Sequence, residues 1–225
     1  MSANQGKGPG SGAKAIAADF HTLYYNNADQ TLRRTRWLGN RVIKCPLDLW
    51  VYQEIIWDLR PGLIIETGSG RGGSAYFMAC MCDLTGHGRI VTVDVRDVER
   101  PAHDRVTYLQ GSSIEPAVIE RMRAEAEGED TVMVLLDSDH SKEHVLAELA
   151  EYARLVTPGS YLIVEDTNVN GHPVVPDHGP GPMEAVHEFL ASDAGSEFEI
   201  DEGAEKFFLT MNPSGYLKRT GGKRQ

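Results

Sequence analysis

The sequence contains little of what several protein classes require. Its 225 residues include only Cys45, Cys80 and Cys82, too few for a disulfide framework, and no Cys/His pairs have the spacing of a zinc site. No apolar run approaches the ~20 residues that span a bilayer, and the N-terminal segment lacks the apolar stretch of a secretory signal. Acidic residues outnumber basic ones by 33 to 22, which argues against nucleic-acid binding because phosphate contacts need clustered lysine and arginine. We therefore expect a cytoplasmic protein that does not bind nucleic acid and has no membrane-spanning segment.

What is present is the composition of a globular domain. Hydrophobic residues make up 41% of the chain and charged residues 24%, a mix that can build a core. A length of 225 residues favours one domain over two. We predict a disordered tail over 1–14, rich in glycine and serine, and a single domain over 15–225. In that domain a helical cap (15–61) precedes an α/β core (62–212).

Strand and helix patterns alternate through the centre of the chain. Strands are predicted at 63–67, 89–94, 105–110, 131–137 and 160–166, and helices at 15–25, 46–59, 74–83, 114–126, 142–155 and 182–192. Because the strands are continuous apolar runs, we expect a parallel sheet covered on both faces. Segment 198–212 predicts a closing antiparallel hairpin. The predicted fold class is therefore α/β, a Rossmann-like doubly wound sheet of about seven strands, mostly parallel with a C-terminal antiparallel hairpin.

Helix 46–59 carries two tryptophans, Trp50 and Trp57. We expect them to pack within the core or against a neighbouring helix rather than to contact a ligand. The same helix could instead serve an interface between copies of the chain, so a homo-oligomer is possible.

A glycine-rich loop follows the first predicted strand. Residues 68–73 (GSGRGG) fit G-x-G-x-x-G, a pattern that lets a backbone approach a ligand closely. Glu66 lies just before it, where a carboxylate repels a pyrophosphate but suits a cationic amino-acid group. Asp94 ends the second strand, where it can accept two ribose hydroxyls, so the pair favours S-adenosylmethionine over NAD. The alternative is a tight packing turn with Asp94 as a cap. The candidate contacts within the loop are Gly68, Ser69 and Gly70.

Small polar residues follow the third predicted strand. Ser113, in Gly-Ser-Ser at 111–113, either borders the adenine of the cofactor or caps the helix that starts at Ile114.

Carboxylates end two further strands. Asp137 ends one, and Glu165 with Asp166 ends the next, so the carboxyl ends of parallel strands bring the three together. Two such charges ~4 Å apart repel by about 4 kcal/mol at an effective dielectric near 20, so either one takes a proton or a cation lies among them. Hard oxygen ligands point to Mg²⁺, with Mn²⁺ or Ca²⁺ possible. The alternative is that the three acids are helix caps or loop residues.

Histidines near these acids are the candidate proton acceptors. His140 either takes a proton from an acceptor hydroxyl or simply begins the next helix, and Asp139 either orients it or caps that helix. His172 and His178 lie in the long loop 167–181 and are predicted substrate contacts. His144, within a helix, is expected to be a surface or packing residue.

Five segments together resemble the cephalosporin hydroxylase / rhamnosyl O-methyltransferase family. The resemblance covers roughly residues 40–219 and is carried by ETGSGRGGSA, LLDSDH, VEDTN, NGHPVVPDHGPGPMEAVHEFL and FLTMNPSGYLKR. It implies a class I S-adenosylmethionine-dependent methyltransferase fold with a divalent-metal site. The metal ligands it implies are Asp137, Glu165 and Asp166. The cofactor contacts it implies are Glu66, Gly68, Ser74, Asp94 and Ser113, with Asp137 bordering both sites.

The function these residues predict is O-methylation. A divalent cation would bind neighbouring oxygens of a sugar or secondary-metabolite acceptor, and His140 would take the proton. Catechol-type O-methyltransferases place a catalytic lysine at the position of His140, so the position carries over but the residue type does not. The alternatives are an iron-dependent hydroxylase, an accessory subunit in cephalosporin-type antibiotic modification that binds the cofactor without catalysis, and, more distantly, an NAD oxidoreductase.

Overall fold

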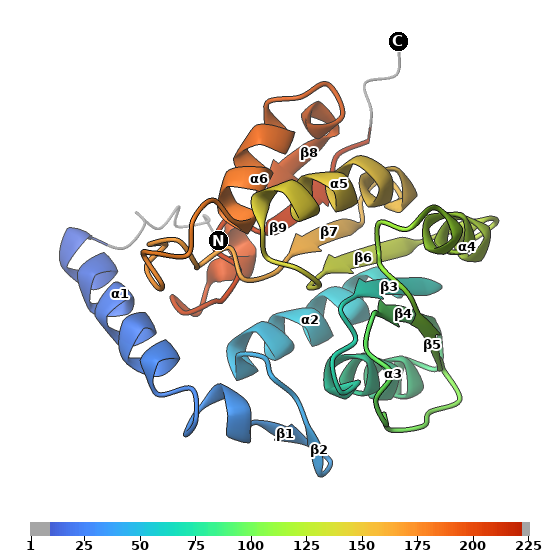
Figure 1. The fold of residues 1–225 in the computed structure, drawn as a ribbon, viewed down its shortest axis with the longest axis horizontal. Coiled ribbons are helices and arrows are strands. Elements are labelled where there is room, and N and C mark those ends of the chain that lie inside the picture. The colour runs from blue at the N-terminus through green and yellow to red at the C-terminus, as the bar shows by residue number, and fades with distance from the viewer. Residues whose placement is uncertain (1–9, 222–225) are drawn as a thin grey trace, which may run out of the picture.

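A computed structural model describes residues 10–221. Its centre is a seven-stranded sheet in the order β5-β4-β3-β6-β7-β9-β8, accompanied by a separate pair, β1-β2 (Figure 1). The seven strands are β3 (Leu63–Thr67), β4 (Arg89–Asp94), β5 (Val106–Gln110), β6 (Val132–Leu136), β7 (Tyr161–Val164), β8 (Phe198–Ile200) and β9 (Tyr216–Arg219). Strands β3 to β7 pair in parallel, whereas β9 is antiparallel to both β7 and β8. This confirms the predicted mostly parallel sheet with antiparallel C-terminal strands.

Helices cover both faces of the sheet, as the unbroken apolar strands predict. Helices α2 and α3 pack on one face, and α4, α5 and α6 pack on the other (Figure 1). Their bounds are α2 (Pro46–Leu59), α3 (Gly73–Thr85), α4 (Pro116–Ala126), α5 (Lys142–Tyr152) and α6 (Pro182–Leu190). All five residues of β3 and all five of β6 are buried. The cores on the two faces therefore share these central strands.

The order in which successive strands join the sheet reverses at β3. Strands β4 and β5 extend the sheet on one side of β3, and β6 then pairs with its other side. Ligands of open α/β sheets bind outside the carboxyl ends of the strands at such a switch point. The carboxyl ends of β3 and β6 are therefore the expected position of a site.

The closing hairpin differs from the prediction of a hairpin within 198–212. Only β8 lies in that segment, and its partner is β9, at 216–219. Between them Glu202–Glu205 forms a short 3₁₀ helix, with the Asp201 side chain accepting a hydrogen bond from the Gly203 N–H. Because β9 inserts between β7 and β8, the sheet also continues past residue 212.

Trp50 and Trp57 contradict the prediction that they pack in the core. They are 57% and 63% exposed. The buried face of α2 instead carries Leu49, Tyr52 and Ile56. Residues seven apart share one face of a helix, and for the two tryptophans it is the outer face. Trp50 is held there by a 3.1 Å hydrogen bond from its indole N–H to Glu54.

The N-terminal part begins with α1 (Ser11–Asn26), a longer helix than the predicted 15–25. The predicted tail, 1–14, thus overlaps a helix at 11–14, which Gly10 precedes in an extended conformation, while 1–9 lies outside the described residues. A 3₁₀ turn (Leu32–Arg34) and the short strands β1 (Arg36–Trp37) and β2 (Asn40–Arg41) connect α1 to α2. Within residues 10–221, none of the helices combines the length and the apolar character that a membrane crossing requires.

Candidate active site

The glycine loop joins β3 to α3 and passes directly over the end of β6. Gly68 has φ +82°, and a Cβ there would lie 1.8 Å from the Asp137 carbonyl oxygen. Its N–H donates to the Val93 carbonyl at 2.8 Å. Only glycine fits this close approach, so the loop backbone lies against the ends of both neighbouring strands.

Glu66 lies beneath this loop and is fully buried. Its carboxylate accepts hydrogen bonds from the Ser74 hydroxyl and, at 2.7 Å, from the Thr92 hydroxyl. Ser69 Oγ lies 2.7 Å from Thr92 Oγ1. Burial raises the pKa of Glu66. The structure therefore brings Glu66, Ser69 and Ser74 together, and Glu66 ties the loop and the start of α3 to β4. Ser69 and Ser74 line a small cavity at the loop.

Asp94 lies at the end of β4, as predicted. One carboxylate oxygen accepts the Gly70 N–H at 2.7 Å, and the other accepts the Arg96 N–H at 2.8 Å. The Arg96 guanidinium also donates to it, at 3.1 Å. Burial raises the pKa of Asp94, but these hydrogen bonds outweigh burial and lower it overall. Arg96, which the sequence analysis did not single out, thus helps to keep this acid ionised.

Ser113 faces the same region from the end of β5. It is 3% exposed, and its hydroxyl lies 3.0 Å from His144 Nε2. Helix α4 begins at Pro116 with Glu115 as its N-cap, so Ser113 does not cap it. Ser113, His144 and Asp94 line one cavity of about 390 Å³, together with Gly68 and Asp137. His144 is therefore not only a packing residue, because it borders a cavity at the switch point.

The acid cluster, defined as Asp137, Glu165 and Asp166, forms where β6 and β7 end. Asp166 has φ +53°, and its N–H donates to the Asn212 side chain at 3.1 Å. Asn212 in turn donates to the Tyr52 hydroxyl at 2.8 Å. The NPSGYLKR ending thus contributes to the site through Asn212, which fixes the backbone of Asp166.

A cation does lie among these acids, and it is Lys44. Its Nζ is 2.5 Å from Asp137 Oδ2 and 2.6 Å from Glu165 Oε1. Tyr52 donates to the same Glu165 oxygen at 2.8 Å. Burial lowers the pKa of Lys44, but Asp137 and Glu165 outweigh burial and hold it above its ordinary value. Close carboxylates need a proton or a cation among them, and here the chain itself supplies the cation from a segment far away in the sequence.

His140 lies between the carboxylates of Asp137 and Asp166. Its Nε2 lies 3.3 Å from Asp137 Oδ1, and its Nδ1 lies 3.4 Å from Asp166 Oδ2. Burial lowers the pKa of His140, but the two carboxylates outweigh burial and raise it to about 9. Each of Asp137, His140 and Asp166 offers one ligand atom, and these atoms lie within 4.8 Å of one another. Two carboxylates and an imidazole suit a hard or borderline divalent cation. The structure brings Glu165 to Lys44 and Tyr52, at the edge of this group.

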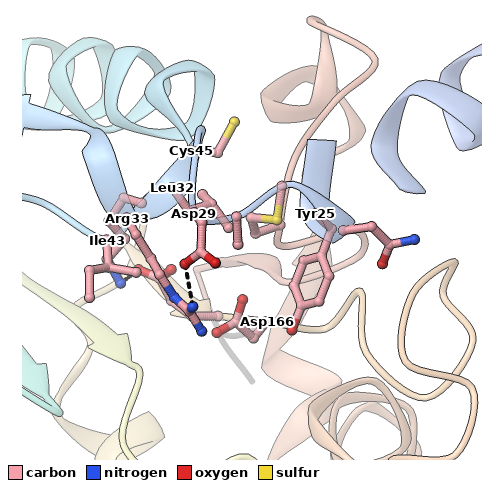
Figure 2. Close-up of a pocket in the computed structure, with 12 residues that line it drawn as sticks. Tyr25, Asp29, Leu32, Arg33, Ile43, Cys45 and Asp166 are labelled. Carbon is pink, nitrogen blue, oxygen red and sulfur yellow. Dashed lines mark hydrogen bonds and ion pairs between the residues drawn. The ribbon is translucent and has the colours of Figure 1, made fainter. Parts of the chain in front are cut away.

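A cavity of about 410 Å³ opens onto the acid cluster (Figure 2). One wall is formed by the end of α1 and the 3₁₀ turn after it, with Tyr25, Asn26, Asp29 and Arg33. Figure 2 shows Tyr25 and Asp166 pointing toward one another and Asp29 paired with Arg33. The distance between Asp29 Oδ1 and Arg33 Nη1 is 2.5 Å. The remaining lining residues are Ala28, Leu32, Ile43, Lys44, Cys45, Glu165, Asp166 and Met211. The predicted helical cap thus forms one side of this cavity.

The loop histidines do not line this cavity. His172 pairs with Glu184 at 2.9 Å and borders a separate cavity that His21 also lines. His178 is exposed, and its ring nitrogen lies 3.2 Å from the Gly179 carbonyl oxygen. Neither histidine lines the cavity of about 410 Å³, but His178 lies near enough to Asp166 for its charge to lower the pKa of that carboxyl, against the effect of burial.

The raised pKa of His140 predicts how stability depends on pH without metal. A folded-state pKa of about 9 exceeds the ordinary 6.5, so the stabilising contribution is fully present below pH 6.5 and is lost as pH rises through 9. We expect the free energy of unfolding in EDTA to fall by on the order of 2 kcal/mol between about pH 6 and pH 9.5. Urea denaturation of the wild type and His140→Gln measures this. The same fall in both proteins would contradict it.

Comparisons with known proteins agree with this architecture. Residues 29–220 match the family described as Rhamnosyl O-methyltransferase/CmcI. A rhamnosyl O-methyltransferase of Mycobacterium bovis (strain BCG / Pasteur 1173P2) is 39% identical over 212 residues, which cover 91% of this chain and 85% of that protein. One from Mycobacterium leprae (strain TN) is 38% identical over 211 residues, covering 91% of each chain.

Solved structures share the fold at lower identity. A CmcI structure with Mg and SAM has a TM-score of 0.66 at 19% identity, covering 84% of this chain and 78% of the other. The MycE methyltransferase in complex with Mg, SAH and mycinamycin VI has a TM-score of 0.59 at 13% identity, covering 92% of this chain and 54% of the other. At these identities the likeness shows the fold alone, that of class I methyltransferases. The match across residues 29–220 and the identity to the mycobacterial enzymes show that this chain belongs to the rhamnosyl O-methyltransferase/CmcI family.

Proposed function

We propose that this chain is an S-adenosylmethionine- and divalent-cation-dependent methyltransferase that methylates a hydroxyl of a sugar. The observation that carries the proposal is the contact between its two candidate sites. Gly68 lies directly over the Asp137 carbonyl, so the glycine loop and the acid cluster meet at the ends of β3 and β6. A methyl donor on one side and an acceptor oxygen on the other would then be adjacent.

The donor side is built by the glycine loop and the strand ends beside it. S-adenosylmethionine, when bound, supplies an electrophilic methyl group on a sulfonium. The cavity that Asp94 and Ser113 line has room for the nucleoside, and Asp94 offers carboxylate oxygens to ribose hydroxyls once Arg96 moves aside. Ser69, Gly70 and Ser74 line the adjoining cavity and suit the amino-acid part. Glu66 stabilises this side from below through Ser74 and Thr92.

The acceptor side is built by the acid cluster. Asp137 and Asp166, with His140 between them, would hold the divalent cation, and Glu165 adds a further carboxylate at its edge. When bound, a divalent cation supplies Lewis-acid polarisation of acceptor oxygens. His140 lies within 3.4 Å of both carboxylates, which keep it protonated in the metal-free protein. A bound cation would offset the charge of these carboxylates and lower the pKa of His140, so that a ring nitrogen not bound to the cation could take the proton that the hydroxyl loses. In the described part of the chain, the possible ligand group Asp137, His140 and Asp166 contains one histidine, which does not favour the two-histidine iron site of a hydroxylase.

Two features support a sugar as the acceptor. The curated relatives at 38–39% identity are rhamnosyl O-methyltransferases. In addition, the cavity of about 410 Å³ combines hydrogen-bonding side chains, namely Tyr25, Asn26, Asp29 and Arg33, with a few apolar ones. Such a lining can bind several hydroxyls of one ring and orient two neighbouring oxygens toward the acid cluster.

A methyl-transfer assay tests the proposal. We expect transfer of labelled methyl from S-adenosylmethionine to a rhamnosyl glycoside in the presence of Mg²⁺, and loss of transfer in EDTA that added Mg²⁺ restores. The product should carry a methyl ether on one ring hydroxyl, located by mass spectrometry and NMR. Equal transfer in EDTA would refute metal dependence. Cofactor binding without transfer to any of a panel of deoxysugar glycosides would favour the accessory-subunit alternative.

The cavity wall formed by the end of α1 and the turn after it predicts an effect on acceptor binding without an effect on cofactor binding. Asp29→Ala removes one partner of the Asp29–Arg33 pair and one hydrogen-bonding side chain of the cavity. We expect KM for the acceptor to rise about tenfold, because one or two hydrogen bonds of 0.5–1.5 kcal/mol each are lost, while the Kd of S-adenosylhomocysteine stays unchanged. Steady-state kinetics and calorimetry measure the two quantities. A change in cofactor affinity alone would show that this wall does not face the acceptor.

A further inference from the structure

Lys44 is a buried cation that the transfer of a methyl group does not by itself require. It is 5% exposed, and its ammonium lies 2.5 Å from Asp137 and 2.6 Å from Glu165. It lines both the cavity on the acceptor side and the small cavity of the glycine loop. The positive charge of Lys44 therefore acts on any charged group that binds in either cavity.

The backbone holds Lys44 in this position. Lys44 lies in the segment that leads from β2 to α2. That segment crosses the start of α3 so closely that a Cβ on Gly73 would lie 2.0 Å from the Arg41 carbonyl oxygen. Lys44 therefore reaches the acid cluster from a segment whose backbone is packed against the start of α3.

The charges explain what this lysine would do. Without it, His140 would be the one basic side chain among residues 10–221 within 4.0 Å of the three carboxylates, with His178 acting on Asp166 from farther away. A buried carboxylate without a partner is strongly destabilising, and a positive charge already in contact reduces the attraction of a site for a second cation. The ammonium contacts Asp137, one of the three residues that could hold the divalent cation.

Building on the proposed function, we propose that Lys44 is an internal counter-ion of the acid cluster, which stabilises the metal-free fold and weakens divalent-cation binding by competing for Asp137 and Glu165. It is a positioning residue, because it acts through these carboxylates. The cation affinity of the site is then set by a balance between Lys44 and the incoming ion, and not by the carboxylates alone.

Calorimetric titration with MgCl₂, without cofactor or acceptor, tests this competition in Lys44→Met, which removes the charge and keeps an unbranched side chain that is shorter by one atom. We expect Mg²⁺ to bind at least about tenfold more tightly than to the wild type. Lys206→Met is the matched control, because Lys206 is an exposed lysine paired with Glu54, outside the acid cluster, and its removal should leave the affinity unchanged. A purely structural role for Lys44 would not tighten binding.

Thermal melting gives a second readout that does not depend on catalysis. In EDTA, Lys44→Met should melt below the wild type, or fail to fold, and saturating Mg²⁺ should close the gap. Lys44→Arg keeps the charge and should bind Mg²⁺ within about threefold of the wild type. The proposal is overturned if Lys44→Met binds no more tightly than the wild type, or if Lys44→Arg tightens binding as much as Lys44→Met. If neither the wild type nor Lys44→Met binds Mg²⁺, both this proposal and the metal dependence of the proposed function fail.

Discussion

Replacing Asp137 with asparagine should lower kcat/KM for methyl transfer by at least about 100-fold, the equivalent of about 3 kcal/mol of transition-state stabilisation. Asp137 contacts Lys44 and His140 at once, and its backbone carbonyl lies under Gly68. The substitution keeps the shape of the side chain but removes the negative charge that would hold a divalent cation. Mg²⁺ affinity should therefore fall together with the rate.

Asp139→Asn is the matched control for this variant. Asp139 lies only two residues away, but its carboxylate accepts hydrogen bonds from the Ser141 N–H at 2.9 Å and from the Ser141 hydroxyl at 2.5 Å. Asp139 also borders the cavity on the donor side, so the control is read on the cation: Asp139→Asn should leave Mg²⁺ affinity within about threefold of the wild type, because its exposed carboxylate lies outside the acid cluster. Wild-type turnover and Mg²⁺ affinity in Asp137→Asn would remove the acid cluster from the mechanism.

Among the described glycines, Gly68 should tolerate replacement by alanine least. The new Cβ would lie 1.8 Å from the Asp137 carbonyl oxygen, and the backbone at this position has φ +82°. We expect the free energy of unfolding to fall by about 3 kcal/mol, because the end of β3 must separate from the end of β6. The affinity for S-adenosylhomocysteine should fall at least about tenfold for the same reason.

Gly70→Ala separates this clash from the effect of backbone strain. Gly70 also has positive φ, +54°, but its nearest neighbour to a Cβ would be Arg96 Nη2, at 3.7 Å. The variant should lose only about 1 kcal/mol. Chemical denaturation and calorimetry compare the two proteins. Equal losses in both would mean that the contact between Gly68 and Asp137 is not what positions the loop.

Much of the fold could be predicted from the sequence because its signals are local. Short, β-branched apolar runs such as those in 63–67 and 132–136 favour buried strands over helices because of their length, and the glycines after the first run mark the turn. The three carboxylates were predictable in the same way, because parallel strands bring their ends to one edge of the sheet. The position of each acid at the end of its strand was enough to predict that Asp137 lies near Asp166.

What could not be predicted depends on contacts between distant segments. Lys44 lies 93 residues before Asp137, and nothing near it in the sequence distinguishes it from an exposed lysine. His144, on α5, gains its place at a cavity only because Ser113, in the turn between β5 and α4, lies 3.0 Å away. The second strand of the hairpin was missed because its four residues follow a Pro-Ser-Gly turn, beyond the segment that shows alternation. These contacts form only when the chain folds, so no local pattern in the sequence predicts them.

The central claim is that the cofactor and the divalent cation bind side by side at the ends of β3 and β6. A crystal structure with S-adenosylhomocysteine and Mg²⁺ tests it most directly. We predict Mg²⁺ about 2.0–2.1 Å from oxygens of Asp137 and Asp166, with Lys44 displaced from at least one carboxylate. The cofactor should lie against Gly68–Gly70 with its sulfur facing the cation. A cation bound elsewhere, or a cofactor that leaves the glycine loop uncovered, would contradict the account.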